Sequence, residues 1–285
     1  MNQESKGFIC GILAGFFYAL MMTFAKLSHD MSSISLVFFR NLICFLALLP
    51  ALRSFTQLKT QKWGLHILRA ISGVISLYGF FYAAQYSQMV NAVLFYNMSP
   101  LFIPVFASLW LKEKLSWQKI VMIMAGFGGI LLIVKPGMSV FHIASIIGVA
   151  ASMTNAFTQV TIKKLSATEN TRTILFYFFI FSMLASFYPA FQSALPVSGN
   201  SCWFYVLAMG CCAFLFQWLL TQAHHFLPAT KVGSVLYSSV AFGGLLGWVF
   251  WRQIPDIWTL LGILVIIASS LHILLEKKPA AASNN

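Results

Sequence analysis

Residues 7–28 read GFICGILAGFFYALMMTFAKLS, an apolar stretch with no charged side chain before Lys26. A helix needs about 20 such residues to cross the roughly 30 Å hydrocarbon core of a bilayer. Stretches of this length recur along the chain, and we predict ten membrane-spanning helices. They cover residues 7–28, 33–53, 65–87, 90–111, 117–135, 141–163, 171–190, 202–223, 228–250 and 256–274.

The composition of the chain agrees with this prediction. Hydrophobic residues make up 59% of the 285 residues and charged residues only 8%. This leaves too little polar surface for a soluble globule, so we expect an all-α integral membrane protein. The connections between the spans are too short to contain a soluble catalytic or ligand-binding domain. Any chemistry must therefore take place inside the helix bundle.

The ten spans divide into two sets of five. An odd number of spans in each half makes the second half enter the membrane upside down, as in transporters built from inverted repeats. We therefore predict two inverted five-helix repeats (5+5), residues 1–137 and 138–277, followed by a disordered cytoplasmic tail, residues 278–285.

The net charge of +12 is explained by membrane orientation. Lys and Arg are enriched in cytoplasmic loops, and placing both termini in the cytoplasm leaves only Lys26, Lys135 and Arg252 outside. The basic residues then inside are Lys6, Arg53, Lys59, Lys62, Lys112, Lys114, Lys119, Lys163, Lys164, Arg172, Lys277 and Lys278. This is a membrane topology signal, and no basic run interleaved with aromatic residues offers a nucleic-acid platform.

Several short motifs suggest a family. Residues 38–41 read FFRN, 66–69 HILR, 97–102 NMSPLF, 111–116 LKEKLS and 129–136 GILLIVKP. The chain resembles the EamA-type family of the drug/metabolite transporter superfamily over essentially its whole length. The pattern departs from the family in two places. First, Lys112 replaces the glycine of the family's LGE turn. Second, the residue of the second half that corresponds to Glu113, at an offset of about 140 residues, is the neutral Gln253.

The resemblance implies a secondary transporter that moves a small organic metabolite by alternating access through a central cavity. Its relatives include metabolite exporters and S-adenosylmethionine uptake proteins, which suggests an amino-acid-like, nucleoside-like or S-adenosylmethionine-like solute. The alternative from another class is a channel or a non-transporting membrane receptor. The chain contains no G-x-S-x-G elbow and no H-E-x-x-H motif, and we expect no enzyme.

Polar residues near the middle of the membrane are the first candidates for the substrate site, because inverted-repeat transporters bind there. At an offset of about 140 residues, residues 96–100 of the first half (YNMSP) correspond to residues 236–240 of the second (LYSSV), and from these segments we select Asn97, Ser99, Tyr237 and Ser238. In the sixth span, Ser152, Asn155 and Gln159 are three and four residues apart and share one helix face, which we expect to face the interior. Gln217 is a further polar residue within a span.

Charged residues inside the spans are costly and carry the most information. Arg40 lies deep in its span, whereas Arg69 and Lys231 lie about a turn from an end, where we favour extension of the side chain to lipid headgroups. No Asp or Glu occurs in the core of any span. This pattern indicates a substrate with a carboxylate or phosphate, which Arg40 could bind bidentately. The predicted substrate-binding residues are Tyr18, Arg40, Arg69, Tyr78, Tyr82, Asn97, Ser99, Ser152, Asn155, Gln159, Gln217, Tyr237 and Ser238.

Cofactors and metals are not expected. Cys211 and Cys212 are separated from His224 and His225 by more than three helical turns and do not have zinc-site spacing. Gly7, Gly11 and Gly15, like Gly243 and Gly247, recur every four residues and indicate close helix packing. The expected partners are the lipid bilayer and a small-molecule substrate, and the expected location is the cell membrane, the inner membrane if the source is bacterial. The sequence leaves the oligomeric state open.

Overall fold

The structure is a computed structural model that describes residues 2–28, 31–52, 58–86, 97–134, 143–192, 200–252 and 256–275. Every regular element in these ranges is helical, which confirms the predicted all-helical membrane protein. The helices are α1 (Gln3–Leu27), α2 (Ser33–Leu48), η1 (Leu49–Ala51), α3 (Trp63–Tyr86), α5 (Ser99–Leu111), α6 (Trp117–Val134), α7 (Ile143–Leu165), α8 (Thr171–Gln192), α9 (Asn200–Phe226), α10 (Ala229–Leu236), α11 (Ser238–Trp251) and α12 (Ile257–Leu275).

The helices match the ten predicted spans within the described ranges. Five segments are long and apolar enough to cross a membrane by length and composition: Gln3–Leu27, Ile34–Ala51, Thr171–Gln192, Cys202–Phe226 and Ala229–Trp251. The last combines α10 and α11, which meet at Tyr237 within the predicted span 228–250. Residues 90–96 of the fourth predicted span lie outside the described residues, and the rest of that span forms α5.

Two helices show that the halves of the chain share a local pattern. Helix α5 begins at Ser99 and α11 at Ser238. Both helices end at a residue in the left-handed conformation, Lys112 with φ 55° and Arg252 with φ 53°, which non-glycine residues adopt rarely. The two ends are separated by the offset of about 140 residues that the sequence indicates.

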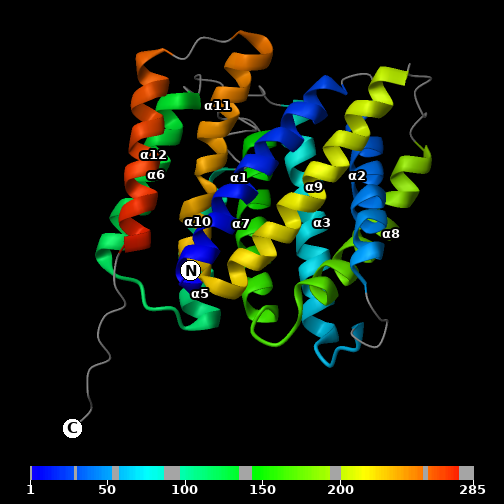
Figure 1. The fold of residues 1–285 in the computed structure, drawn as a ribbon, viewed down its shortest axis with the longest axis horizontal. Coiled ribbons are helices and arrows are strands. Elements are labelled where there is room, and N and C mark those ends of the chain that lie inside the picture. The colour runs from blue at the N-terminus through cyan, green and yellow to red at the C-terminus, as the bar shows by residue number, and fades with distance from the viewer. Residues whose placement is uncertain are drawn as a thin grey trace.

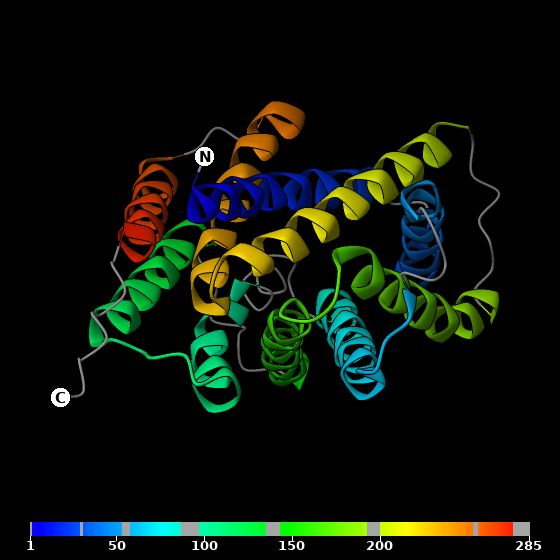
Figure 2. The ribbon, with the colours of Figure 1, turned by 60° about the horizontal axis from the view of Figure 1, so that its bottom comes forward.

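The same helix pairs pack together when each helix is replaced by its counterpart in the other half. Helix α1 packs along α9, and α3 packs along α7 in the same way. The pairs α1–α11 and α5–α7 are likewise equivalent. The pairs α2–α8 and α6–α12 each join a helix to its own counterpart in the other half. Figures 1 and 2 show α6 and α12 side by side at one end of the molecule and α2 and α8 at the other. In Figure 1, α5 ends at the lower edge and α11 at the upper edge, so the corresponding helices run in opposite directions.

The glycine stripe of α1 allows close packing of the helices, as predicted. A Cβ atom added at Gly7 would lie 2.7 Å from Leu227 Cγ, and one at Gly11 would lie 2.8 Å from Val235 Cγ1. A Cβ at Gly15 would approach both Ser238 and Ser239. Only glycine lets α1 approach the second half this closely.

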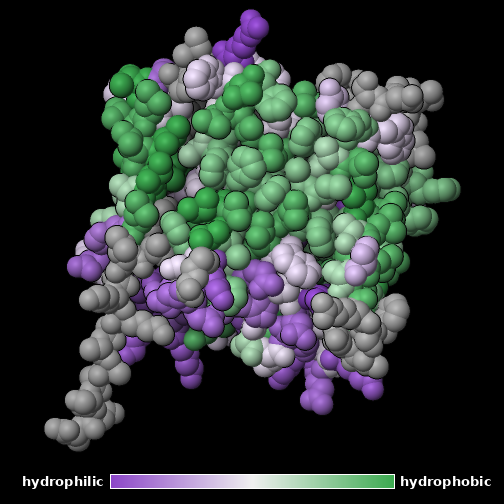
Figure 3. Space-filling view, in the orientation of Figure 1, coloured by the Kyte–Doolittle hydropathy of each residue, from purple (hydrophilic) through white to green (hydrophobic). Residues whose placement is uncertain are grey.

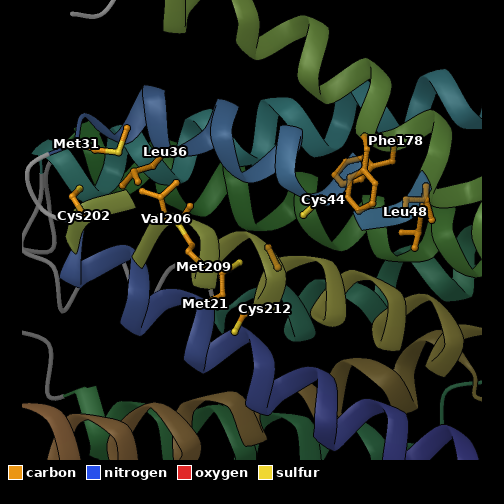
Figure 4. Packing of buried hydrophobic residues seen from close by; sticks show 13 residues of the cluster. Met21, Met31, Leu36, Cys44, Leu48, Phe178, Cys202, Val206, Met209 and Cys212 are labelled. Carbon is orange, nitrogen blue, oxygen red and sulfur yellow. The ribbon is translucent and has the colours of Figure 1, made fainter. Parts of the chain in front are cut away.

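A second contact between the halves is apolar. Figure 4 shows Met21 of α1 and Leu36 of α2 beside Val206 and Met209 of α9, all of them buried. Such side chains fix the distance between helices by dense packing. This cluster lies directly beside the cavity described below, to which Met21, Leu36 and Met209 also contribute.

The visible surface is consistent with a bilayer environment. Figure 3 shows a broad apolar band across the molecule, with hydrophilic side chains concentrated along its lower edge. Large apolar side chains are strongly exposed on the molecule, including Leu109 at 76% and Phe191 at 82%. An exposed apolar surface of this extent is typical of proteins surrounded by lipid.

Candidate functional site

A cavity of about 440 Å³ lies between the two halves of the chain. Its lining comes from α1, α2, α3 and Asn97 in the first half and from α7, α8, α9 and α11 in the second. At one end it reaches the exposed side chains of Met22 and Lys26, and Lys26 Nζ lies 4.1 Å from the centre of the Trp251 ring. Toward the other end lies Arg69, near the start of α3. The volume is within the range of small-molecule sites.

Arg40 faces the cavity from α2. Its side chain is buried, its Nε donates to Met21 Sδ at 3.5 Å, and its Nη1 donates to Asn41 Oδ1 at 3.1 Å. Asn41 is fully buried and its Nδ2 donates to Ser186 Oγ at 3.5 Å, which ties this group to α8. Both acceptors of Arg40 are neutral, so these contacts orient the guanidinium without neutralising its charge.

Arg69 lies deep in the cavity, and the expectation that it extends to lipid headgroups is wrong. The residue is 1% exposed, and its guanidinium lies 4.1 Å from the centre of the Phe178 ring. Its Nη1 donates to the Ile174 carbonyl at 3.3 Å and its Nη2 to Gln217 Oε1 at 3.5 Å, whereas its buried Nε has no partner. α3 packs against α7 and α8, and Arg69 is enclosed by this packing. Lys231 is also buried, with its Nζ 3.6 Å from Glu4 Oε1.

A group of polar side chains joins the halves beside the cavity. Asn155 Nδ2 of α7 donates to Ser99 Oγ of α5 at 3.0 Å. Asn97, Ser99, Asn155 and Gln159 line a small adjoining hollow of about 20 Å³ together with Tyr18. These amides and hydroxyls offer both donors and acceptors to a ligand.

Contacts between the halves close the end of the bundle beyond Arg69. Glu113 Oε1 accepts from the Ala229 amide at 2.8 Å, and its Oε2 accepts from the Thr230 amide at 3.3 Å and Thr230 Oγ1 at 2.8 Å. The carboxylate thus caps the positive N-terminus of α10. Two further bonds near this end lie within the second half and join α7 to α9: Lys163 Nζ donates to the His224 carbonyl at 2.7 Å, and the His224 ring contacts Gln159 Oε1 at 2.8 Å. Gln253, the counterpart of Glu113, lies outside the described residues.

The structure brings most of the predicted site residues together. Those that line the cavity or the adjoining hollow are Tyr18, Arg40, Arg69, Asn97, Ser99, Asn155, Gln159 and Gln217. The expectation that the polar face of α7 points inward is met by Asn155 and Gln159.

The other five predicted residues lie away from the described cavity lining. Tyr237 is 1% exposed and packs with Ile130 and Ile266 between α6 and α12. Ser238 faces Gly15, Ser152 donates to the Gly148 carbonyl of its own helix, Tyr78 donates to the Ala185 carbonyl, and Tyr82 is exposed. Ser152 and Tyr78 satisfy their hydroxyls with backbone carbonyls of the bundle. The hydroxyls of Tyr237 and Ser238 are instead buried among packed helices, without a hydrogen-bond partner in the described part of the chain.

The cavity also contains residues that the sequence reasoning missed. Ser239 faces it instead of Ser238, and Ser76 and Thr158 add hydroxyls. Gly243 and Gly247, expected to pack closely, line the cavity, and a Cβ added at Gly243 would meet no atom within 4 Å. Small residues at a four-residue spacing indicate close packing and an open cavity wall equally well, so the pattern alone gave no usable signal.

Comparison with known proteins supports a transporter assignment. The model of the EamA-like transporter family matches residues 5–135 and again residues 142–275. The pseudopaline exporter CntI of Pseudomonas aeruginosa is 28% identical, over 98% of this chain and 99% of that protein. The riboflavin transporter of Vibrio cholerae is 24% identical, over 94% and 92%, and the S-adenosylmethionine uptake transporter of Rickettsia felis is 26% identical, over 98% and 97%.

The fold has a match among solved structures. A crystal structure superposes with a TM-score of 0.82 at 15% sequence identity, covering 93% of this chain and 95% of that one. The two family matches together span nearly the whole sequence and agree with the motifs and the helical architecture. The chain is therefore a multi-pass membrane transporter, not an enzyme, and belongs to the EamA-like transporter family.

Proposed function

We propose that this protein is a secondary transporter that moves a small organic metabolite by alternating access. Its two five-helix halves, residues 1–137 and 138–277, are inverted repeats that rock against each other around the cavity, with both termini in the cytoplasm. The opposite directions of α5 and α11 and the packing that repeats under exchange of the halves support this arrangement. The hydrophilic side chains at the edge where α5 ends support the orientation.

The two ends of the bundle differ in a way that suits one state of such a cycle. The cavity reaches the surface near Lys26, whereas at the other end Glu113 of the first half is hydrogen-bonded to Ala229 and Thr230 of the second. The structure then corresponds to an outward-open state, and access from the cytoplasm requires these contacts to break. Rocking of rigid halves about packed helices is a common form of such a transition.

The proposal rests chiefly on the environment of Arg40. This cation is buried in the wall of a cavity shared by both halves, and the acceptors it contacts among the described residues are neutral. A carboxylate or phosphate on the solute would neutralise it with bidentate hydrogen bonds. Asn97, Ser99, Asn155, Gln159 and Gln217 would bind the polar remainder, and Tyr18 would contact an apolar or ring portion. Amino-acid-like, nucleoside-like and S-adenosylmethionine-like solutes fit this chemistry where they carry such an acidic group. The relatives named above are an exporter of pseudopaline, a transporter of riboflavin and an uptake transporter of S-adenosylmethionine.

Counterflow into proteoliposomes tests the proposal. Vesicles containing the full chain are preloaded with a pool of amino acids, nucleosides, S-adenosylmethionine and organic acids, and uptake of each labelled solute is followed. We expect saturable counterflow that Arg40→Ala reduces strongly and that Arg172→Gln, outside the cavity lining, preserves. Flux without counterflow would indicate a channel instead. Binding without any flux would indicate a receptor.

A further inference from the structure

We infer that the solute is an organic anion with two acidic groups, one bound by Arg40 and the other by Arg69. This inference rests on the proposed transport function and names the substrate class of the same cavity. It starts from the charge of the lining, whose described residues include Lys26, Arg40 and Arg69 but no Asp or Glu. A cavity with this lining attracts anions and repels cations.

Neither arginine has its charge neutralised within the described protein. Arg40 donates to a thioether and an amide oxygen, and Arg69 donates to a backbone carbonyl and an amide oxygen. Both side chains are buried, and burial of an unpaired charge is unfavourable. The acidic side chains that the structure describes contact other groups: Glu4 contacts Lys231, Glu113 Ala229, Glu169 Thr60 and Asp256 Thr259. The described part of the chain therefore supplies no acidic partner to either arginine, and a ligand can supply both.

The two arginines lie at different depths. Gly210 of α9 packs against Ile43, and Gln217, about 10 Å further along the same helix, contacts Arg69. Arg40 lies almost one more turn toward the outer end than Ile43. The backbone levels of the two arginines are thus separated by on the order of 15 Å. The two guanidiniums also have separate neighbours, Met21 and Asn41 for Arg40 and Phe178 and Gln217 for Arg69. A flexible chain of several bonds with an acid at each end matches this separation better than a single carboxylate.

The immediate neighbours of the arginines explain why the site is selective for acids. Asn41 and Gln217 occupy the positions where an internal salt-bridge partner would sit, and each is the neutral amide of an acidic side chain. Both amides orient the guanidinium and leave its charge for a ligand. At the outer end, Lys26 beside Trp251 adds a third positive charge that would guide an anion into the cavity.

Two isosteric variants test this assignment, because Asn41→Asp and Gln217→Glu each supply an acid without changing shape. We expect both variants to unfold at the same or a higher temperature than the wild type, since each neutralises a buried cation. At the same time each should weaken binding of a dianion about tenfold or more, because its carboxylate competes with the ligand. If Asn41 and Gln217 had purely structural roles, their acidic variants would not bind the dianion more weakly while unfolding at the same or a higher temperature.

The probes are succinate, glutarate, adipate and suberate, each compared with its own monoamide. Binding is measured on the purified full chain from the ligand-dependent rise in unfolding temperature, with Arg172→Gln as the control. The wild type should bind at least one dianion tenfold more tightly than its monoamide, and both isosteric variants should lose that preference. The inference is overturned if no dianion is preferred, or if the variants retain the preference.

Counterflow of the same solutes separates this inference from the proposed function. If dianions bind selectively but none exchanges across the membrane, the binding assignment stands and the transport proposal fails. If neutral or singly charged solutes exchange as well as dianions do, transport stands and the two-acid assignment fails.

Discussion

Replacing Glu113 by glutamine should weaken the contacts between the halves at the end that we propose faces the cytoplasm. The Glu113 carboxylate accepts three hydrogen bonds from Ala229 and Thr230 across the two halves. Glutamine keeps one oxygen but loses the second acceptor and the negative charge at the N-terminus of α10. Hydrogen bonds to charged groups contribute about 1.5 to 3 kcal/mol, and the favourable interaction with the helix dipole adds to this. We therefore expect a loss of about 2 kcal/mol.

A change of this size shifts the ratio of inward-open to outward-open molecules about 30-fold. The assay measures the accessibility of a cysteine introduced by Thr158→Cys in the cavity wall, in a background whose five native cysteines are replaced. A membrane-impermeant maleimide is added on the cytoplasmic side of inverted vesicles. Glu113→Gln should raise the labelling rate by about the same factor of 30.

The matched control is Glu4→Gln at the same end of the molecule. Glu4 also contacts the second half, through Lys231, but its side chain is 50% exposed. Exposed ion pairs contribute about 0 to 1 kcal/mol, so this variant should change the labelling rate less than about fivefold. An unchanged rate in Glu113→Gln, or an equal rise in Glu4→Gln, would refute the role of Glu113 in closing this end.

Three further predictions concern packing, charge and direction. Gly11→Leu should destabilise the fold by about 1 to 3 kcal/mol, because its Cβ would lie 2.8 Å from Val235 Cγ1. The control is Gly128→Leu, where no atom lies within 4 Å of the added Cβ. In thermal unfolding, Gly11→Leu should have the lower midpoint of the two variants. Lys26→Gln should slow anion uptake severalfold at low salt and leave it unchanged at high salt, when flux is compared across ionic strengths. Uncoupled movement of a dianion should follow the membrane potential. For two charges the potential contributes about 4.6 kcal/mol per 100 mV and favours export from a negative interior. A flux that does not respond to an imposed potassium diffusion potential would contradict this prediction.

The sequence predicted the helical architecture well because the bilayer restricts the possible structures. Each span must be long and apolar, and only a helix satisfies its backbone in lipid, so residues 7–28 and their repeats identify the fold class directly. The four-residue spacing of Gly7, Gly11 and Gly15 predicted the close approach of α1, but the same spacing at Gly243 and Gly247 occurs in the cavity wall. Depth in the membrane singled out Arg40 and Asn97 as residues that needed a polar environment.

The faces of individual helices were less predictable. The break at Tyr237 means that a single helical periodicity cannot be extended from α10 into α11, and Ser239 rather than Ser238 lines the cavity. Arg69 lies near the end of its helix, yet neighbouring helices cover it, and only the packing of α3 against α7 and α8 reveals that. Tyr82 is similarly ambiguous, because an aromatic residue is equally suited to a cavity wall and to lipid.

The central claim, that solute passes through the cavity between the halves, is tested most directly by filling the cavity. Gly243 lines it with no atom within 4 Å of an added Cβ, so Gly243→Phe places a ring in the path without a clash in the wall. The control Gly128→Phe adds the same ring on α6, outside the described lining, where the space is also open. Counterflow in proteoliposomes should be abolished by Gly243→Phe and retained by Gly128→Phe, with both proteins folded. Full counterflow in Gly243→Phe would contradict the account.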